Sequence, residues 1–458
     1  MNIKKNIYFI GAGGIGMAAL ERYFLSRGYR IGGYDRTPTD LTSALEREGV
    51  EISFDDSAEA IPAAFRNPEE TLVVYTPAVP DSHAGLAWFR ANGFEVTKRA
   101  AVLGLVTRQS KALCFSGTHG KTTTSSMAAH LLHCSPEGCN AFLGGVLRNY
   151  NTNFLLDEKS DYSVVEADEY DRSFHHLRPY VAVVTSTDPD HLDIYGTEEA
   201  YLESFAHFTE LIQPGGVLIK HTGLKLSERP DQSVKVFTYS RDHGNFHAEN
   251  IRYGNGTIIF DFIHPEGRIK DIPLGVPVEI NITNAVASLA AVWATGTLND
   301  AVVREAMGTF MGPKRRFEFH YKPEKGPVVI DDYAHHPDEL RNSIASVRAL
   351  YPGRKLTVAF QPHLYSRTRD FAPQFAKALS AADKVVLLDI YPARELPIPG
   401  VSSEIVFNEI TSPEKRLIVK EDLVATLDND GFDVLLTVGA GDICNYLPEI
   451  VKLAEKRS

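Results

Sequence analysis

Residues 112–125 read ALCFSGTHGKTTTS, an apolar run followed at once by a glycine-bearing loop. The apolar run has the length of a buried strand, and residues 125–132 after the loop have helical spacing. A strand, a glycine loop and a helix in this order can bind phosphate, because backbone N–H groups and the helix N-terminus face the anion. Lys121 would reach the transferred phosphate and Thr122 would face Mg²⁺. The full GxxxxGK[ST] spacing is absent, since Phe115 stands at its first glycine.

Short apolar runs of the same kind recur along the whole chain, separated by stretches with helical spacing. Runs that do not alternate and that are interleaved with helices are typical of parallel strands buried on both faces. The sequence therefore predicts an α/β fold with ligands beyond the carboxyl ends of the strands. The segment 217–271 differs, because 235–240 and 257–263 alternate around turn residues, and we expect antiparallel strands there. The expected parallel strands are 6–10, 71–76, 112–116, 162–166, 181–185, 328–332, 356–360, 385–390 and 434–438.

Two breaks in this pattern predict three domains. A polar stretch at 107–111 precedes a fresh strand, and Gly312-Pro313 followed by a cluster of basic residues interrupts the chain again. We therefore expect domains at 1–108, 109–313 and 314–458, which agrees with the roughly three domains that 458 residues predict at about 150 residues each.

A second glycine loop, YFIGAGGIGM at residues 8–17, follows the first expected strand and opens a helix. It has the GxGxxG spacing that lets a backbone approach a pyrophosphate. Asp35 follows the next strand, where dinucleotide-binding folds place the acid that binds ribose. Any ligand with a pyrophosphate fits this loop, so NAD and UDP-linked compounds stay open, as does a tight turn without a ligand. The predicted ligand-binding residues are Gly11, Gly13, Gly14, Gly16 and Asp35.

Two acidic segments follow neighbouring expected strands. They read EADEYD at 166–171 and DPDHLD at 188–193. Carboxylate oxygens suit Mg²⁺, and a histidine nitrogen can join them at a second metal. Because a divalent cation relieves the repulsion between carboxylates, we expect metal binding here. The alternative is a pair of solvated acidic loops.

The composition excludes several classes of protein. The 458 residues include 47 Lys and Arg against 59 Asp and Glu, a net charge of −12, so we expect no nucleic-acid partner. No run approaches the roughly 18 apolar residues of a membrane span, so we expect no membrane insertion. The 4 cysteines lack paired spacing for zinc or a disulfide framework. Residues 1–10 lack the features of a signal peptide, so we expect a cytoplasmic protein.

Taken together, the motifs resemble those of the Mur ligases, and among them the enzymes that add L-alanine to UDP-N-acetylmuramate. The resemblance implies a Rossmann-like N-terminal domain for the UDP-sugar, a central ATPase domain with Mg²⁺, and a Rossmann-like C-terminal domain for the amino acid. It spans essentially the whole chain. The matching segments are GAGGIGM, GTHGKTTT, EADEYDRSF, DPDHLDIYG, NITNA, GPKRRFE, DDYAHHPDE, QPHLYSRTRD, DIYPARE and VGAGD.

The resemblance also implies roles for individual residues. Lys121 would contact the γ-phosphate of ATP, Glu166 and His191 would bind Mg²⁺ with Thr122, and His363 and Arg367 would bind the incoming amino acid. No general base is evident, and His363 is the candidate because histidine titrates near neutral pH. The implied ATP-binding residues are Gly117, Thr118, His119, Gly120, Lys121, Thr122, Thr123, Asn281, Asn284, Arg316, Asp332, His335 and His336.

Two positions depart from the family pattern. The adenine-side motif usually carries a histidine before its first asparagine, whereas Val278-Glu279-Ile280 precedes Asn281 here. Leu364 stands where the family often has arginine, so recognition of the amino-acid carboxylate would depend more on Arg367 or Arg369.

Other assignments leave part of the sequence unused. An NAD-dependent dehydrogenase would leave GTHGKTTT without a role, and a plain P-loop ATPase or kinase would leave the first domain without one. The family's recycling ligase, which adds a tripeptide to UDP-N-acetylmuramate, usually has a longer insertion where only 174–180 intervenes here. We expect a monomer or a weak homodimer. Other histidines (His130, His175 and His207) are expected on the surface or satisfied in the core, and His335-His336 before Pro337 could cap a helix over 338–350.

Overall fold

The computed structural model describes residues 4–76, 78–254, 256–393 and 395–458. These residues form two compact units. The first comprises the chain up to 249 together with 261–270 and 283–307, and the second comprises 250–260, 271–282 and 308–458. The described strands form sheets of five, seven, three and six strands, which confirms the predicted α/β fold.

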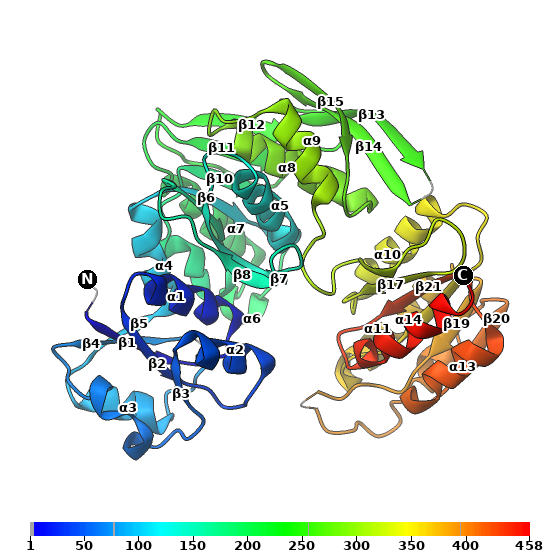
Figure 1. Cartoon of the computed structure of the whole chain (residues 1–458), viewed down its shortest axis with the longest axis horizontal. Helices are drawn as coiled ribbons and strands as arrows, with labels where there is room; N and C mark the ends of the chain where they lie inside the picture. Colours follow the sequence, from blue (N-terminus) through cyan, green and yellow to red (C-terminus); the bar gives the residue numbers. More distant parts are fainter. Residues whose placement is uncertain (1–3, 77, 255, 394) are drawn as a thin grey trace. The chain divides into compact units, whose positions relative to one another are not determined.

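The first sheet, drawn in blue in Figure 1, is entirely parallel and has the order β3-β2-β1-β4-β5. The order reverses at β1, and parallel sheets bind ligands at such a switch point. The first glycine loop follows β1 and therefore lies at this point. The strands are β1 (Asn6–Ile10), β2 (Arg30–Tyr34), β3 (Glu51–Ser53), β4 (Thr71–Tyr75) and β5 (Glu95–Lys98), and the helices are α1 (Ile15–Ser26), α2 (Asp40–Glu48), α3 (Ala84–Ala91) and α4 (Arg99–Arg108).

The second sheet has the order β12-β11-β10-β6-β9-β7-β8 and is parallel except at β8. Its central strand β6 leads into the second glycine loop, between the ends of β9 and β10. The strands are β6 (Lys111–Ser116), β7 (Asn140–Leu147), β8 (Thr152–Leu155), β9 (Tyr162–Glu166), β10 (Val181–Val184), β11 (Val217–His221) and β12 (Lys235–Tyr239). The helices of this part are α5 (Lys121–His133), α6 (Leu192–Tyr195), α7 (Glu198–Glu210), α8 (Glu279–Trp293) and α9 (Asp300–Thr309).

The segment predicted to be antiparallel is only partly so. The expectation for 235–240 is wrong, because β12 pairs parallel with β11 at the edge of the second sheet. The exposure of residues along β12 falls gradually, from exposed at Lys235 to buried at Tyr239, so the alternation of residue types does not mark an antiparallel strand. Beyond it, β13 (His247–Gly254), β14 (Thr257–His264) and β15 (Gly267–Pro273) form a separate sheet. Connections of two residues are too short for a parallel crossover, so these three strands run antiparallel.

The C-terminal sheet, drawn in yellow to red in Figure 1, has the order β16-β17-β21-β18-β19-β20. It is parallel except at β16. Its strands are β16 (Glu318–Tyr321), β17 (Val328–Asp332), β18 (Leu356–Phe360), β19 (Lys384–Leu387), β20 (Glu414–Leu417) and β21 (Val434–Val438). Its helices are α10 (Pro337–Leu350), α11 (Tyr365–Leu379), α12 (Glu404–Phe407), α13 (Leu423–Asp430) and α14 (Leu447–Glu455). Short 3₁₀ helices of the chain are η1 (Ala58–Ala60), η2 (Ala63–Phe65), η3 (Tyr170–His176), η4 (Lys420–Asp422) and η5 (Ile443–Tyr446).

Within the first unit, α1 packs against β7 and β8 of the second sheet. The Tyr23 ring meets the ring of Phe142 at 5.4 Å between centroids. Asn153 Nδ2 donates to the carbonyl of Ile15 at 2.6 Å, and Arg22 Nη1 donates to Asn153 Oδ1 at 2.8 Å. These contacts fix the helix that follows the first glycine loop against the sheet that carries the second loop.

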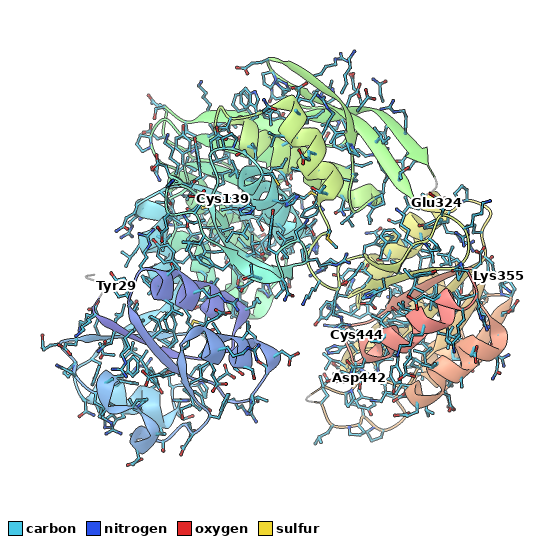
Figure 2. All side chains as sticks on the ribbon, in the orientation of Figure 1. Tyr29, Cys139, Glu324, Lys355, Asp442 and Cys444 are labelled. Carbon is cyan, nitrogen blue, oxygen red and sulfur yellow. The ribbon has the colours of Figure 1, made fainter. Side chains whose placement is uncertain are left out.

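The four cysteines are free thiols, and Figure 2 labels Cys139, which is buried in the first unit, and Cys444, which is half-buried in the second. None of the helices in the described part of the chain has the length and apolar character needed to span a bilayer.

Candidate functional site

The second glycine loop is held open by two residues with positive φ. Gly117 has φ +131°, and a Cβ there would lie 2.2 Å from Thr185 Oγ1 at the end of β10. Gly120 has φ +82° and precedes the first residue of α5. The backbone N–H of His119 donates to Ser186 Oγ at 2.8 Å, and Thr118 Oγ1 donates to the carbonyl of Asp188 at 2.6 Å. The loop is thus tied to the end of β10, with the N-terminus of α5 pointing into the site.

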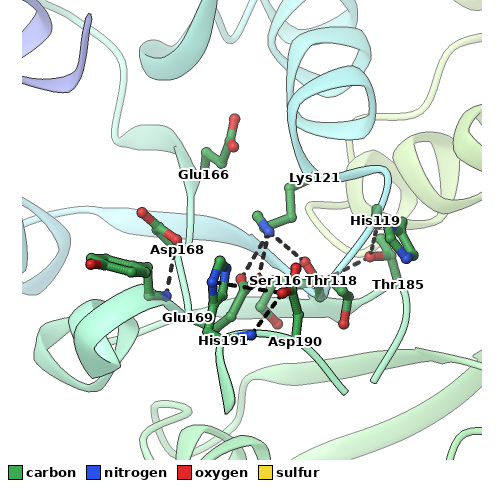
Figure 3. Close-up of polar contacts among 12 residues, drawn as sticks. Ser116, Thr118, His119, Lys121, Glu166, Asp168, Glu169, Thr185, Asp190 and His191 are labelled. Atoms are coloured by element: carbon green, nitrogen blue, oxygen red, sulfur yellow. Dashed lines mark hydrogen bonds and ion pairs between the residues drawn. The ribbon is translucent and has the colours of Figure 1, made fainter. Parts of the chain in front are cut away.

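Lys121, the first residue of α5, has its ammonium group fixed on both sides. Its Nζ donates to the carbonyl of Gly117 at 2.7 Å and to Glu169 Oε1 at 2.9 Å (Figure 3). Glu169 is only 1% exposed. Burial raises the pKa of Glu169, and Lys121 opposes that shift. Glu169 belongs to the acidic segment 166–171, but its pairing with Lys121 depends on tertiary structure and leaves no signal of its own in the sequence.

Glu166 ends β9 beside the P-loop helix. Thr122 Oγ1 donates to its Oε1 at 3.0 Å, and the backbone N–H of Gly144 donates to its Oε2 at 3.1 Å. Burial raises the pKa of Glu166, and Lys121 is the largest influence lowering it. A P-loop hydroxyl next to one carboxylate is the protein share of a typical Mg²⁺ site, since nucleotide phosphates and water supply the other ligands. Thr122 and Glu166 therefore fit the predicted metal.

His191 lies apart from this pair. Figure 3 shows its ring beside Asp190, with an Nδ1 to Oδ1 distance of 3.7 Å, while Glu166 points away from both. The backbone of His191 has φ +52°, and Tyr170 packs edge-on against its ring. Among the described residues, no group of three or more His, Cys, Asp or Glu side chains converges on a metal position. The structure thus brings Thr122 and Glu166 together but not His191.

The asparagine motif contributes one residue directly at the loop. Thr124 Oγ1 donates to Asn284 Oδ1 at 3.3 Å, and a Cβ on Gly120 would lie 3.0 Å from the same oxygen. Asn281, one turn earlier in α8, donates its side-chain amide to the carbonyl of Val276. Thr123 lies in the first turn of α5 and is half-buried.

The first glycine loop is built differently. Gly11 has φ +94°, and its N–H donates to the carbonyl of Tyr34 at 2.8 Å. The N–H of Gly13 donates to Asp35 Oδ2 at 2.6 Å, and a Cβ on Gly13 would lie 2.9 Å from that oxygen. Gly14 is the N-cap of α1. The predicted acid therefore lies at the loop, where it also accepts a backbone hydrogen bond.

A cavity of about 340 Å³ connects this loop with the acids of the second sheet. It runs along the N-terminus of α1 on one side and reaches Glu166 and Asp168 on the other. Its described lining residues are Gly14, Ile15, Gly16, Met17, Ala19, Thr76, Arg99, Leu103, Phe142, Leu143, Gly144, Glu166 and Asp168. One partly open cavity thus touches both the pyrophosphate-type loop and the carboxylate predicted to bind metal.

In the second unit, the candidate amino-acid residues cluster beyond β17 and β18. Arg367 Nη1 lies 3.3 Å from His363 Nδ1, and the rings of His335 and His363 are 6.2 Å apart. Arginine can only donate, so Nδ1 accepts and the neutral ring carries its proton on Nε2. Burial and then Arg367 lower the pKa of His363, which favours that neutral ring at pH 7. The arrangement offers two donors, which suits carboxylate binding better than the predicted role of general base.

The remaining predicted residues of this unit have structural partners. Asp332 accepts hydrogen bonds from the backbone of Phe317 and from the Ser343 hydroxyl. His336 is the N-cap of α10, which matches the capping role considered from sequence. Arg316 is exposed and lies 5.8 Å from the centre of the Tyr333 ring. Arg394 of the DIYPARE segment lies outside the described residues.

Comparison with known proteins gives consistent matches along the chain. The Mur ligase family catalytic-domain model matches residues 6–111, the Mur ligase middle-domain model matches 115–292, and the Mur ligase glutamate ligase-domain model matches 315–441. A UDP-N-acetylmuramate–L-alanine ligase of Phocaeicola vulgatus is 56% identical over 100% of both chains. The enzyme of the same name from Parabacteroides distasonis is 58% identical over 97% of this chain and 96% of its own length. The crystal structure of UDP-N-acetylmuramate-alanine ligase MurC from Thermotoga maritima superposes with a TM-score of 0.81, at 27% identity, over 98% of this chain and 99% of that one.

Proposed function

The chain belongs to the Mur ligase family, and from that premise we propose that it joins L-alanine to the carboxylate of UDP-N-acetylmuramate at the expense of ATP. The observation that carries this proposal is the cavity that extends from the first glycine loop to Glu166, next to the P-loop. A sugar nucleotide whose pyrophosphate lies at the first glycine loop and whose sugar carboxylate reaches toward Glu166 would suit this cavity. A nicotinamide dinucleotide would give the P-loop no role.

The first glycine loop would bind the pyrophosphate of the UDP-sugar. The N-terminus of α1 provides N–H groups and a positive dipole end for an anion. Asp35 already accepts the N–H of Gly13, and its second oxygen accepts the N–H of Thr37 at 3.2 Å. It would hold the loop in shape while facing the ribose hydroxyls.

The second glycine loop would bind the ATP phosphates. Lys121 and the N–H groups at the start of α5 would contact the β- and γ-phosphates, and Asn284 lies against the same loop on the far side of Gly120. Thr122 and Glu166 would hold Mg²⁺, which when bound neutralises charge on the transferring phosphoryl group. His191 would join a second metal only after moving toward the phosphates.

The chemistry is acyl activation followed by amide formation. An oxygen of the sugar carboxylate attacks the γ-phosphorus of ATP, the bond to the β-phosphate oxygen breaks, and an acyl phosphate and ADP result. The amine of L-alanine then attacks the acyl carbon, loses a proton, and expels inorganic phosphate. Lys121 stabilises the charge on the γ-phosphoryl oxygens in the first step. His363 and Arg367 would bind the alanine carboxylate as two donors and orient its amine.

We keep three further expectations as part of this proposal. The domains at 1–108, 109–313 and 314–458 would carry the UDP-sugar, ATP with Mg²⁺, and the amino acid respectively. The protein would act in the cytoplasm, where its proposed nucleotide substrates are made. It would work as a monomer or weak homodimer, which sedimentation velocity at several concentrations measures.

The test is phosphate release from ATP and Mg²⁺ with different substrates. We expect release only when UDP-N-acetylmuramate and L-alanine are both present, with weaker activity for glycine or L-serine. Activity with the tripeptide in place of L-alanine would assign the chain to the recycling ligases instead. Phosphate release that required neither the UDP-sugar nor an amine would refute the ligase proposal. Hydride transfer to or from NAD would instead favour the dehydrogenase assignment.

A further inference from the structure

Arg99, the first residue of α4, lies inside the cavity that joins the two glycine loops. Its guanidinium packs directly on Gly16, the last glycine of the first loop. A Cβ on Gly16 would lie 2.9 Å from Arg99 Nη1 and 3.2 Å from Cζ. The absence of a side chain at Gly16 therefore makes the room that this guanidinium occupies.

The charged side chains that line this cavity, among the described residues, are one arginine and two acids. The arginine is Arg99, and the acids that face it are Asp168 and Glu166. Burial lowers the pKa of Arg99, and these two carboxylates oppose the shift, so the guanidinium stays charged. The side chain is half-buried, and a charge partly withdrawn from water normally has hydrogen-bonded partners.

Yet the guanidinium makes no hydrogen bond, and no ion pair within 4 Å, with any residue that the structure describes. The two acids that line the cavity differ from the guanidinium in this respect. Glu166 accepts hydrogen bonds from Thr122 and Gly144. Asp168 accepts one from the backbone of Tyr170. The planar fork of N–H donors on this cavity-lining side chain thus has capacity for an oxyanion.

We propose that Arg99 binds an oxyanion of the sugar nucleotide in this cavity and thereby sets the position of the substrate between the two loops. This inference rests on the proposed function. The oxyanion has two possible sources on the same molecule: the pyrophosphate, next to Gly16, and the lactyl carboxylate, next to Glu166. Either contact would be bidentate, because a guanidinium matches the geometry of phosphate and carboxylate oxygens.

The experiment measures dissociation constants by calorimetry for the full-length chain and three variants. Arg99→Met removes the charge and the fork, Arg99→Lys keeps the charge only, and Arg108→Met removes an exposed arginine at the other end of α4 as a matched control. The ligands are UDP-N-acetylmuramate, UDP-N-acetylglucosamine, which lacks the carboxylate, and ATP. Thermal melting of each variant checks the fold.

Loss of a bidentate charged contact should weaken UDP-N-acetylmuramate binding to Arg99→Met by at least about tenfold, with a smaller loss for Arg99→Lys. ATP binding and the Arg108→Met variant should be unchanged. An equal loss for UDP-N-acetylglucosamine assigns the pyrophosphate, and a loss confined to UDP-N-acetylmuramate assigns the carboxylate. Unchanged affinity of the Arg99 variants for both sugar nucleotides would overturn the inference alone. A wild-type chain that bound neither would overturn the proposed function with it.

Discussion

The two glycine loops of the first unit share a strand–loop–helix plan and differ in their charged side chains. At the loop after β1, a carboxylate contacts the loop backbone, because Asp35 accepts the N–H of Gly13. At the loop after β6, an ammonium group contacts the loop backbone instead, because Lys121 Nζ donates to the carbonyl of Gly117. Two further carboxylates accept hydrogen bonds from the start of α5: Glu169 from Lys121, and Glu166 from Thr122.

The difference separates binding from chemistry. A loop that only holds a pyrophosphate needs N–H groups and a helix N-terminus, and an acid beside it can select a ribose. A loop that transfers a phosphoryl group needs a positioned positive charge and a metal-binding carboxylate, because charge develops there in the transition state. Changes in the second loop should therefore affect turnover, and changes in the first should affect substrate affinity.

The largest effect is expected from Lys121→Ala in the second loop. Turnover should fall by roughly 10³-fold or more, because the charge that stabilises the transferred phosphoryl group is lost. The affinity for UDP-N-acetylmuramate should stay the same. Steady-state ADP formation and calorimetry measure the two quantities.

This variant also leaves the buried Glu169 without its ion-pair partner. The double variant Lys121→Ala with Glu169→Gln removes that burial cost and should melt at a higher temperature than the single variant, while remaining inactive. Normal turnover in a folded Lys121→Ala variant would show that the P-loop assignment is wrong.

A smaller loss is expected for Glu166→Gln. Glutamine can still accept from Thr122 and Gly144, but it lacks the charge that Mg²⁺ requires, so kcat should fall by roughly 100-fold and the Mg²⁺ concentration for half-maximal rate should rise. The exposed Glu158→Gln variant, on the turn before β9, serves as the control. An unchanged Mg²⁺ dependence in Glu166→Gln would remove Glu166 from the metal site.

For the first loop we expect a change in affinity. Asp35→Asn keeps an oxygen that can accept from Gly13 but weakens a charged hydrogen bond to ribose, so KM for the UDP-sugar should rise about tenfold with little change in kcat. KM for ATP should not change. The exposed Asp56→Asn variant is the matched control. A fall in kcat at unchanged KM would contradict the division between the loops.

The sequence predicted much of the fold because its main signals are local. The glycine loops and the predicted parallel strands follow from short patterns of apolar and glycine residues, and these strands are confirmed. The helix expected over 125–132 is present as α5, but it begins four residues earlier, at Lys121. The direction of β12 could not be predicted, because it depends on which strand lies beside it in the sheet. Neither could the ion pair of Lys121 with Glu169 or the cavity position of Arg99, since those depend on which strands become neighbours in the sheets.

The helices that follow the two loops also differ in the ionisable side chain that each one buries. On α1, Glu21 is fully buried, and neither carboxyl oxygen has a hydrogen-bond partner among the described residues. On α5, His130 is buried with its Nδ1 2.7 Å from the Tyr150 hydroxyl. Burial disfavours the charged form of each, so it raises the pKa of Glu21 and lowers the pKa of His130 to about 4.

These two buried groups should therefore make the stability of the folded state depend on pH with opposite signs. The folded state resists ionisation of Glu21, so wild-type stability should fall relative to Glu21→Gln as pH rises above the ordinary value of 4.5. The folded state resists protonation of His130, so wild-type stability should fall relative to His130→Asn as pH drops from 6.5 toward 4. Each slope is at most about 1.4 kcal/mol per pH unit.

Urea unfolding between pH 4 and 8 measures these differences without reference to activity. The exposed Glu46→Gln variant on α2 is the control for the loss of a surface carboxyl. Because the prediction concerns only the sign of two slopes, it is independent of how well each substitution packs. If the stability differences of Glu21→Gln and His130→Asn from wild type changed with pH in the same direction, burial would not be what sets the charge state of these two groups. The difference between the two strand–loop–helix segments would then be confined to the loops.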